Sequence, residues 1–311
     1  MNKSWIIGFL FGWMMIVVSA CSDRVLDISA DSHDEVLNEV GYEQFGEEGF
    51  PVNVEDSLGR TVIIDESPER IVAYDAALVE ILFAIGEGKR IIGTHSFVDY
   101  PAEAAEIPKV GGAFEMDIES IIELNPDLVY VFFPTFVEPL EAAGLKVLYI
   151  ETLKHDFRAI ATNIRLWGQI VGNPAEADII ASRFTSRIEK IRSIVKHGAD
   201  GPRVLNDLGM LWASGSNTLE QEVFDLLNVY NIASNLEGYA QISIEEIIAG
   251  DPEYIFTPGP DEFLTNRAFD DVNAVQNGNV ITLDGQLLTI AGPRFVQGIE
   301  NLAKLIYPDL F

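Results

Sequence analysis

Short runs of β-branched and aliphatic residues alternate with helically spaced apolar residues over most of this 311-residue chain. Runs long enough for one strand each occur at residues 70–74, 90–93, 127–133, 146–150, 203–205, 254–256 and 279–283. Between the first two runs, Leu78, Ile81, Leu82 and Ile85 follow the spacing of a helix with one apolar face. Strands that alternate with helices predict an α/β fold with mostly parallel sheets and helices on both faces.

The alternation stops between residues 156 and 197, where two helices are predicted in succession. The first is broken by Gly172-Asn173-Pro174. The second carries one long apolar stripe, formed by Ala177, Ile180, Ala181, Phe184, Ile188, Ile191 and Val195. We therefore predict an N-terminal α/β lobe at residues 51–173, a long rigid joining helix at 174–200 and a C-terminal α/β lobe at 201–311. The first lobe should begin with a hairpin, formed by residues 52–56 and 61–64.

An internal repeat supports the division into two similar lobes. Residues 118–127 (IESIIELNPD) and 244–253 (IEEIIAGDPE) share one pattern at an offset of 126 residues, and each precedes a predicted strand. We expect each to form a short helix whose isoleucines face the core and which ends before the proline. Two such lobes would place a ligand cleft between them, where the carboxyl ends of strands and their loops converge.

The N-terminus carries an export pattern. Lys3 precedes an apolar run at residues 5–18, which is short for a membrane span of ~20 residues, and Ser19-Ala20 stand directly before Cys21. This arrangement resembles the lipobox of bacterial lipoproteins, in which the cysteine is lipidated. We interpret residues 1–20 as a signal peptide and 21–50 as a lipidated Cys21 with an acidic tether. The protein would then be exported and anchored to the cell membrane, facing the periplasm or the extracellular side. The alternative is a retained signal anchor with an incidental cysteine.

Charge and composition exclude some partners and some chemistry. The formal charge of −29 repels phosphate backbones, which argues against nucleic-acid binding. A single cysteine allows no disulfide framework, and no G-x-S-x-G motif is present. The four histidines are scattered, and a metal site would need His95, His155 and an aspartate to converge. We therefore expect neither an enzyme nor a resident metal, and no covalent group other than lipid on Cys21.

The loops expected at the cleft are rich in aromatic residues. Flat aromatic walls with few charges suit a large, partly apolar ligand, although each ring could equally pack in the core. The candidate ligand-binding residues are Tyr74, Phe97, Phe114, Phe133, Trp212 and Phe263.

From about residue 52 onward the chain resembles the class III substrate-binding lipoproteins of ABC transporters, which capture cobalamin, iron–siderophore complexes or haem. The resemblance is carried by Glu69-Arg70-Ile71-Val72, by residues 80–86 (EILFAIG), by Asp99-Tyr100-Pro101, by the repeated helices and by Gly292-Pro293-Arg294. It implies two lobes joined by a rigid helix, a monomer, and permease and ATPase subunits as partners. It also implies that Glu119 and Glu245, one in each repeat, dock onto permease arginines.

The resemblance leaves the ligand open. Residues 93–101 (GTHSFVDYP) resemble a loop of cobalamin-binding members, with Phe97 where they carry tyrosine. The chain departs from them at Ala113-Phe114, where tryptophan would be expected, and at Tyr74-Asp75, where Ser-Pro is usual. We expect a cobalamin-like corrinoid, with iron–siderophore or haem as alternatives. A lipid-anchored metal-dependent enzyme and a transporter-independent ligand sensor are the competing function classes.

Overall fold

The structure is a computed structural model that describes residues 49–151, 156–195, 201–283 and 286–311. The predicted signal peptide, Cys21, most of the tether, and His33, His155 and His197 lie outside these residues. Within them, no helix combines the length and the apolar character needed to cross a membrane.

The N-terminal lobe is built on a four-stranded parallel sheet in the order β4-β3-β5-β6. An antiparallel hairpin of β1 (Val52–Glu55) and β2 (Thr61–Ile64) precedes it, as predicted. The sheet strands are β3 (Ile71–Tyr74), β4 (Ile91–Gly93), β5 (Leu128–Val131) and β6 (Val147–Tyr149). The lobe's helices are α2 (Ala76–Ala84), α3 (Ile118–Glu123) and α4 (Val137–Ala142), with 3₁₀ turns η1 (Gly88–Arg90), η2 (Ala102–Glu106) and η3 (Pro134–Phe136).

The C-terminal lobe contains a second four-stranded parallel sheet in the order β12-β11-β7-β9, together with an antiparallel pair, β8 and β10. Its strands are β7 (Arg203–Asn206), β8 (Trp212–Ser214), β9 (Tyr230–Asn231), β10 (Tyr239–Gln241), β11 (Tyr254–Phe256) and β12 (Val280–Ile281). Its helical segments are α7 (Leu219–Leu226), α8 (Ile244–Gly250), α9 (Asp261–Leu264), η4 (Arg267–Phe269), α10 (Asn273–Gln276), α11 (Gln286–Thr289) and α12 (Phe295–Ile306).

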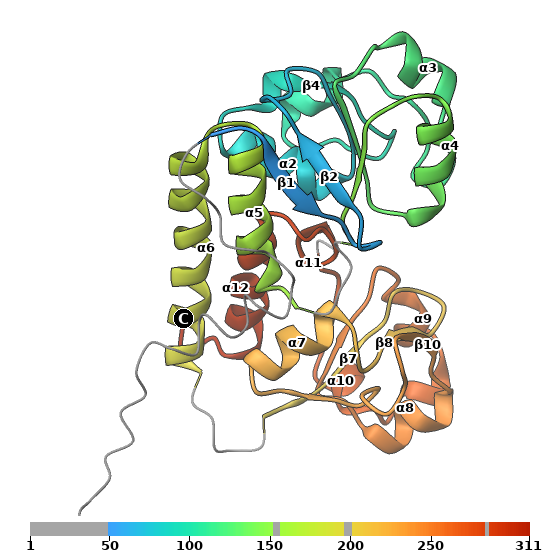
Figure 1. Ribbon diagram of the computed structural model, residues 1–311. Coiled ribbons are helices and arrows are strands. Elements are labelled where there is room, and N and C mark those ends of the chain that lie inside the picture. Colours follow the sequence, from blue (N-terminus) through green and yellow to red (C-terminus); the bar gives the residue numbers. More distant parts are fainter. Residues whose placement is uncertain (1–48, 152–155, 196–200, 284–285) are drawn as a thin grey trace, which may run out of the picture. The chain divides into compact units, whose positions relative to one another are not determined.

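The two lobes share one topology. If the strands of each four-stranded sheet are numbered 1 to 4 along the chain, both sheets have the order 2-1-3-4. By this numbering β3 corresponds to β7, and β5 corresponds to β11. The repeated helices α3 and α8 directly precede the corresponding strands β5 and β11 (Figure 1). The predicted fold of two α/β lobes with parallel sheets is confirmed.

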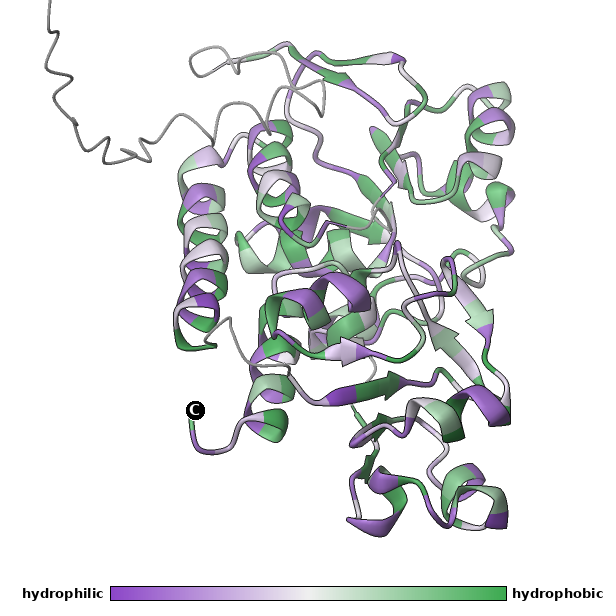
Figure 2. Cartoon of the chain, turned by 90° about the horizontal axis from the view of Figure 1, so that it is seen from below, coloured by the Kyte–Doolittle hydropathy of each residue, from purple (hydrophilic) through white to green (hydrophobic). Residues whose placement is uncertain are grey.

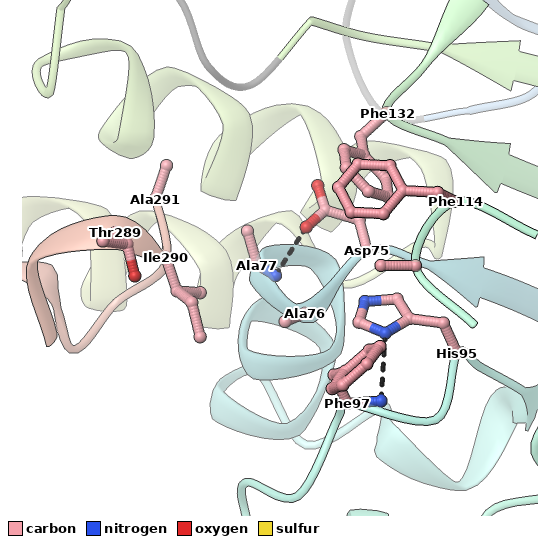
Figure 3. Close-up of a pocket in the computed structure, with 11 residues that line it drawn as sticks. Asp75, Ala76, Ala77, His95, Phe97, Phe114, Phe132, Thr289, Ile290 and Ala291 are labelled. Atoms are coloured by element: carbon pink, nitrogen blue, oxygen red, sulfur yellow. Dashed lines mark hydrogen bonds between the residues drawn. The ribbon is translucent and has the colours of Figure 1, made fainter. Parts of the chain in front are cut away.

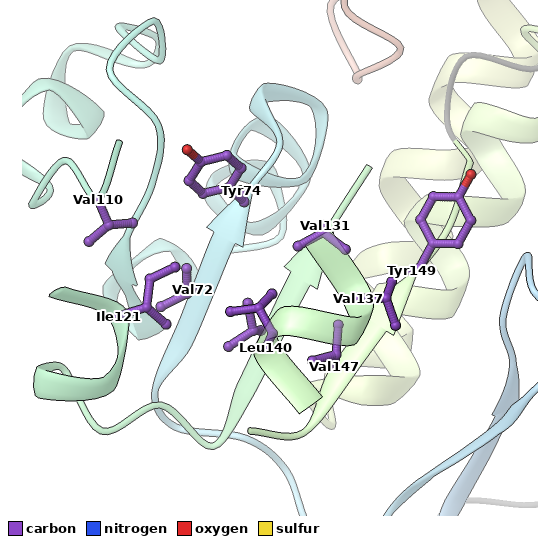
Figure 4. Packing of buried hydrophobic residues seen from close by; sticks show 10 residues of the cluster. Val72, Tyr74, Val110, Ile121, Val131, Val137, Leu140, Val147 and Tyr149 are labelled. Carbon is purple, nitrogen blue, oxygen red and sulfur yellow. The ribbon is translucent and has the colours of Figure 1, made fainter. Parts of the chain in front are cut away.

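The central parallel strands of each lobe are the most deeply buried. In the N-terminal lobe every residue of β3 and β5 is buried, and Val72, Val131 and Leu140 lie in one apolar cluster (Figure 4). Tyr74 belongs to this cluster and is 0% exposed, and its hydroxyl donates to the carbonyls of Gly112 and Glu115.

The structure thus places the ring of Tyr74 in the core rather than on a cleft wall, where it was expected from the sequence. Phe263 is also 0% exposed and packs against Phe269, with ring centroids 5.1 Å apart. It lies in the apolar cluster of the C-terminal lobe, so the structure places this ring in the core as well.

The joining segment is a pair of packed helices, α5 (Ala159–Ile170) and α6 (Pro174–Ile194) (Figure 1). They approach closely at Gly168, where an added Cβ would lie 2.1 Å from the Cβ of Ala177. The predicted stripe of α6 is buried at Ala177, Ala181, Phe184, Ile188 and Ile191. The helices carry both hydrophobic and hydrophilic residues (Figure 2), as expected for elements with one buried and one exposed face.

The joining helix is also tied to the end of the chain. Arg187 of α6 forms a bidentate ion pair with Glu300 of α12, at 2.8 Å for each contact. Helix α6 is thus held by its packing against α5 and by the ion pair between Arg187 and Glu300. These contacts favour a rigid connection between the lobes over a loop hinge.

The isoleucines of the repeated helices do not all face the core as predicted. Ile121 and Ile247 are fully buried, but Ile122 is 45% exposed and Ile248 is 44% exposed. Successive residues of a helix point about 100° apart, so a short helix that packs on its lobe through Ile121 or Ile247 turns the next isoleucine away from the core.

Candidate ligand-binding site

A pocket of about 300 Å³ opens at the carboxyl ends of the central strands of the N-terminal lobe (Figure 3). The strand order reverses between β3 and β5, which is where open α/β sheets bind ligands. Asp75 follows β3 and Phe132 follows β5, and both line the pocket. The sheet topology therefore explains why the pocket lies here.

Aromatic rings form much of the wall. Phe97 and Phe114 line the pocket and are 70% and 75% exposed, which is unusual for rings of this size in a folded chain. Phe133 lies behind Phe114, with ring centroids 5.5 Å apart, and Phe132 rather than Phe133 reaches the pocket. Two of the six predicted aromatic residues thus converge on one site, and a third supports one of them.

His95 is the polar side chain at the centre of the aromatic wall. Its ring is 6% exposed and lies near the rings of Tyr74, Phe97 and Phe132 at centroid distances of 5.6 to 6.3 Å. Burial, together with the positive charge of Lys109, lowers the pKa of His95 to about 4. The imidazole is therefore neutral at physiological pH.

The tautomer of His95 follows from its backbone contact. Nδ1 accepts a hydrogen bond from the backbone N–H of Phe97 at 3.3 Å (Figure 3). A neutral imidazole that accepts at Nδ1 carries its proton on Nε2. His95 thus offers a hydrogen-bond donor to the pocket rather than the lone pair that a metal ion would need.

The pocket holds little charge. Asp75 caps helix α2 by accepting from the backbone N–H of Ala77 at 2.8 Å and is 8% exposed. No lysine or arginine lines the pocket within the described residues. The Lys109 ammonium instead donates to the carbonyls of Val98 and Ala104, at 2.8 and 2.9 Å, and so holds its own loop. In the same part of the chain, no three His, Cys, Asp or Glu side chains group together as a metal site.

The wall opposite the aromatic rings comes from the far end of the sequence and was not predicted. Thr289, Ile290 and Ala291 line the pocket opposite the aromatic rings (Figure 3). The adjacent Gly292 allows close approach, since an added Cβ would lie 2.7 Å from Oε2 of Glu80. The only sequence signal was the Gly292-Pro293-Arg294 motif directly after this segment.

The segment directly after residues 289–291 is fixed to the N-terminal lobe by an ion pair. Arg294 donates from Nη2 and Nε to Oε1 of Glu80 at 2.6 and 3.0 Å, and Glu80 is 4% exposed. The guanidinium also lies over the ring of Tyr100, 3.3 Å from its centroid. Three motif segments far apart in the sequence meet here and hold the pocket together.

The corresponding place in the C-terminal lobe has a related construction. Asp207 follows β7, is 2% exposed, and accepts from the hydroxyl of Thr257, the residue after β11, at 2.6 Å. The next loop contains Met210 and Leu211 at positive φ of 54° and 59°, a conformation that side chains rarely adopt. Met210 is 76% exposed. Strain of this kind is often retained where a loop serves binding.

Trp212 ends this loop and begins β8. It is 43% exposed and therefore accessible, but it does not line the pocket of the N-terminal lobe. The predicted docking glutamates, Glu119 and Glu245, are exposed in the first turns of α3 and α8 and do not line the pocket.

Comparison with known proteins agrees with this architecture. Residues 71–287 match the periplasmic binding protein family. The chain is 28% identical to the uncharacterised ABC transporter substrate-binding lipoprotein YvrC of Bacillus subtilis, over 85% of this chain and 88% of that protein. It is 29% identical to a vitamin B12-binding protein of Vibrio cholerae, over 76% of this chain and 89% of that protein.

Among solved structures, the periplasmic haem-binding protein RhuT of Roseiflexus sp. RS-1 in apo form is 25% identical. It has a TM-score of 0.70 and covers 78% of this chain and 99% of that one. The chain belongs to the periplasmic binding protein family. It is a substrate-binding protein of the kind that serves ABC importers, which confirms the predicted class.

Proposed function

We propose that the protein captures a cobalamin-like corrinoid at the pocket described above and delivers it, as a monomer, to an ABC importer. The observation that carries this proposal is the pair of exposed rings, Phe97 and Phe114, that flank a neutral His95. A cavity of about 300 Å³ would hold only part of a large ligand, so the exposed rings would cover the rest.

The charge of the pocket favours a corrinoid over haem. Haem carries two carboxylates, which would need cationic partners when removed from water. The wall among the described residues supplies Asp75 instead, while Arg294 and Lys109 are engaged elsewhere. A corrin ring carries neutral amides, which can accept a hydrogen bond from Nε2 of His95. The vitamin B12-binding relative agrees with this preference, and the haem-binding structure keeps the alternative open.

The experiment is a titration of the purified protein with cobinamide, haem and a ferric siderophore, followed by visible absorption and calorimetry. We expect cobinamide to bind with the highest affinity. Its spectrum should lack the change that imidazole coordination produces, because Nε2 of His95 carries a proton. Tightest binding of haem or of the siderophore would overturn the ligand assignment and leave the transport class intact.

Truncating the rings should weaken binding while the fold survives. A stacked ring contributes ~0.5–1.5 kcal/mol beyond the area it buries, so Phe97→Ala or Phe114→Ala, which truncate the two exposed rings of the pocket, should each lower affinity several-fold or more. Tyr230→Ala is the matched control, because Tyr230 is 59% exposed on β9 and does not line the pocket. Unchanged affinity for both test variants would show that these rings do not contact the ligand.

We further propose that the protein is held at the outer face of the cell membrane by lipid on Cys21. The lipobox-like Ser19-Ala20-Cys21 sequence and the lipoprotein relative support this anchor. Cys21 lies outside the described residues, so the support is from sequence alone. Mass spectrometry of the mature protein should find an acylated cysteine at its N-terminus. An unmodified Cys21 inside an uncleaved chain would contradict the anchor.

We also propose that Glu119 and Glu245 dock onto the permease. They occupy the same position of the repeat, are exposed, and stand on corresponding helices of the two lobes. One glutamate in a first helical turn is explained by the helix dipole, but a matched second glutamate is not required by stability. Paired basic sites on a permease dimer would require both.

A further inference from the structure

Each proposed docking glutamate has an exposed isoleucine beside it. Ile122 stands three residues after Glu119 on α3, and Ile248 stands three residues after Glu245 on α8. Side chains at this spacing are neighbours on a helix surface. The two isoleucines are exposed to nearly the same extent, 45% and 44%.

The retention of these isoleucines is selective within the repeat. The other helix positions that are exposed in at least one of the two helices differ, since Ser120 corresponds to Glu246 and Glu123 corresponds to Ala249. Among the exposed positions of the two helices, only the glutamate (Glu119, Glu245) and the isoleucine three residues later (Ile122, Ile248) are the same. Common descent of the two halves would not by itself preserve two surface positions while their neighbours changed.

The fold does not need these two side chains. The core contacts of α3 and α8 are made by Ile121 and Ile247, which are fully buried. The helix starts are fixed by Asp117, which accepts from the N–H of Ser120, and by a capping box between Ser243 and Glu246. An isolated exposed isoleucine is ordinary, but two at equivalent positions beside equivalent charges call for a common partner.

We propose that Glu119 with Ile122, and Glu245 with Ile248, form two equivalent docking pairs that fit a two-fold symmetric membrane permease. Each permease half presents a basic side chain next to a shallow apolar recess that takes the isoleucine. The inference rests on the proposed docking role of the glutamates and adds an apolar contact to it. A basic partner is favoured over a second copy of this chain, because two copies with a formal charge of −29 repel each other.

The two components of a docking pair should act on different steps. Exposed charge pairs mainly speed encounter and are weakened by salt, whereas an apolar side chain seated in a recess mainly slows dissociation. Substitution of the isoleucines should therefore weaken docking equally at low and high salt. Substitution of the glutamates should weaken it mostly at low salt.

The test measures binding of the full-length protein to the permease–ATPase complex encoded with it, reconstituted in lipid nanodiscs. The double variant Ile122→Gln plus Ile248→Gln should bind about tenfold more weakly or worse at both salt concentrations, chiefly through faster dissociation. Its ligand affinity and thermal midpoint should match wild type. Ile179→Gln is the matched control, because Ile179 is 51% exposed on α6 outside the repeat.

The outcomes separate this inference from the docking role of the glutamates. Wild-type docking by the isoleucine variant, with weakened docking by Glu119→Gln plus Glu245→Gln, would overturn the inference and leave the docking role standing. Wild-type docking by both double variants would overturn both. A change in self-association by sedimentation, with permease binding unaltered, would make a second copy the occupant and also overturn the inference.

Discussion

Replacing Arg294 by methionine should lower the free energy of unfolding by about 3–5 kcal/mol, the usual cost of breaking a buried ion pair by removing one partner. Arg294 is the partner of Glu80, whose side chain is 3% exposed. Methionine keeps the apolar volume of the side chain but leaves a buried carboxylate without its guanidinium. The stacking on Tyr100 is lost as well. Chemical denaturation measures the effect.

Two further variants make this prediction specific. Arg165→Met removes an exposed pair with Asp178, whose side chains are 39% and 64% exposed, and should cost no more than ~1 kcal/mol. Adding Glu80→Gln to Arg294→Met should recover much of the loss, because the uncompensated charge is gone. If Arg294→Met lowered the free energy of unfolding no more than Arg165→Met does, the ion pair between Glu80 and Arg294 would not be what fixes the pocket wall at residues 289–291.

The pH dependence gives a second check on the same ion pair. Burial raises the pKa of Glu80, and Arg294 is the group that opposes this rise. Without Arg294 the folded-state pKa should rise further above that of the unfolded chain. A raised carboxyl pKa costs stability at neutral pH, and that cost disappears as the pH falls through the folded-state value. The stability gap between wild type and Arg294→Met should therefore narrow in acid.

Replacing both glutamates that we propose for docking should nearly abolish uptake without harming the protein. Close charge pairs at interfaces contribute ~1.5 kcal/mol or more each, so Glu119→Gln plus Glu245→Gln should weaken permease binding about 100-fold at low salt. Ligand affinity should be unchanged, and stability should change by less than about 1 kcal/mol, because both side chains are exposed. Uptake of labelled ligand in cells and binding to the reconstituted permease are the two measurements.

The control for this variant is Glu138→Gln plus Glu189→Gln, which changes the net charge equally at exposed sites on α4 and α6. It should transport like wild type. Full uptake by the Glu119 and Glu245 double variant would show that these glutamates are solvated helix charges only. Equal loss by the control pair would instead point to the overall acidic field.

Sequence periodicity predicted the main sheets well and the small elements poorly. All seven strand-like runs of the two lobes became strands of the two parallel sheets. The pair β8 and β10 and the strand β9 were missed. Length alone does not explain this, because β12 has only two residues and was predicted from the run of β-branched and aliphatic residues around it. The pairing of the missed strands depends on what the rest of the lobe places beside them.

Sequence patterns did not predict correctly which aromatic rings near the strand ends line the pocket and which are buried. A residue near a strand end was assumed to face the cleft, yet successive side chains of a strand point to opposite sides. Tyr74 therefore enters the core while Asp75 lines the pocket, and Phe132 lines it while Phe133 packs behind. Phe97 and Phe114 do line the pocket, because they lie in loops, where no buried face competes for the ring.

The sequence by itself determined the α/β class, the joining helix, the two-lobe repeat and the glutamates that mark it, because local periodicity and self-similarity are visible along one dimension. Tertiary structure alone decided that residues 289–291 close the pocket and that Glu80 meets Arg294, 214 positions away. It also decided which isoleucine of each repeated helix is exposed. Contacts between distant residues depend on how the layers pack, and no local pattern encodes that packing.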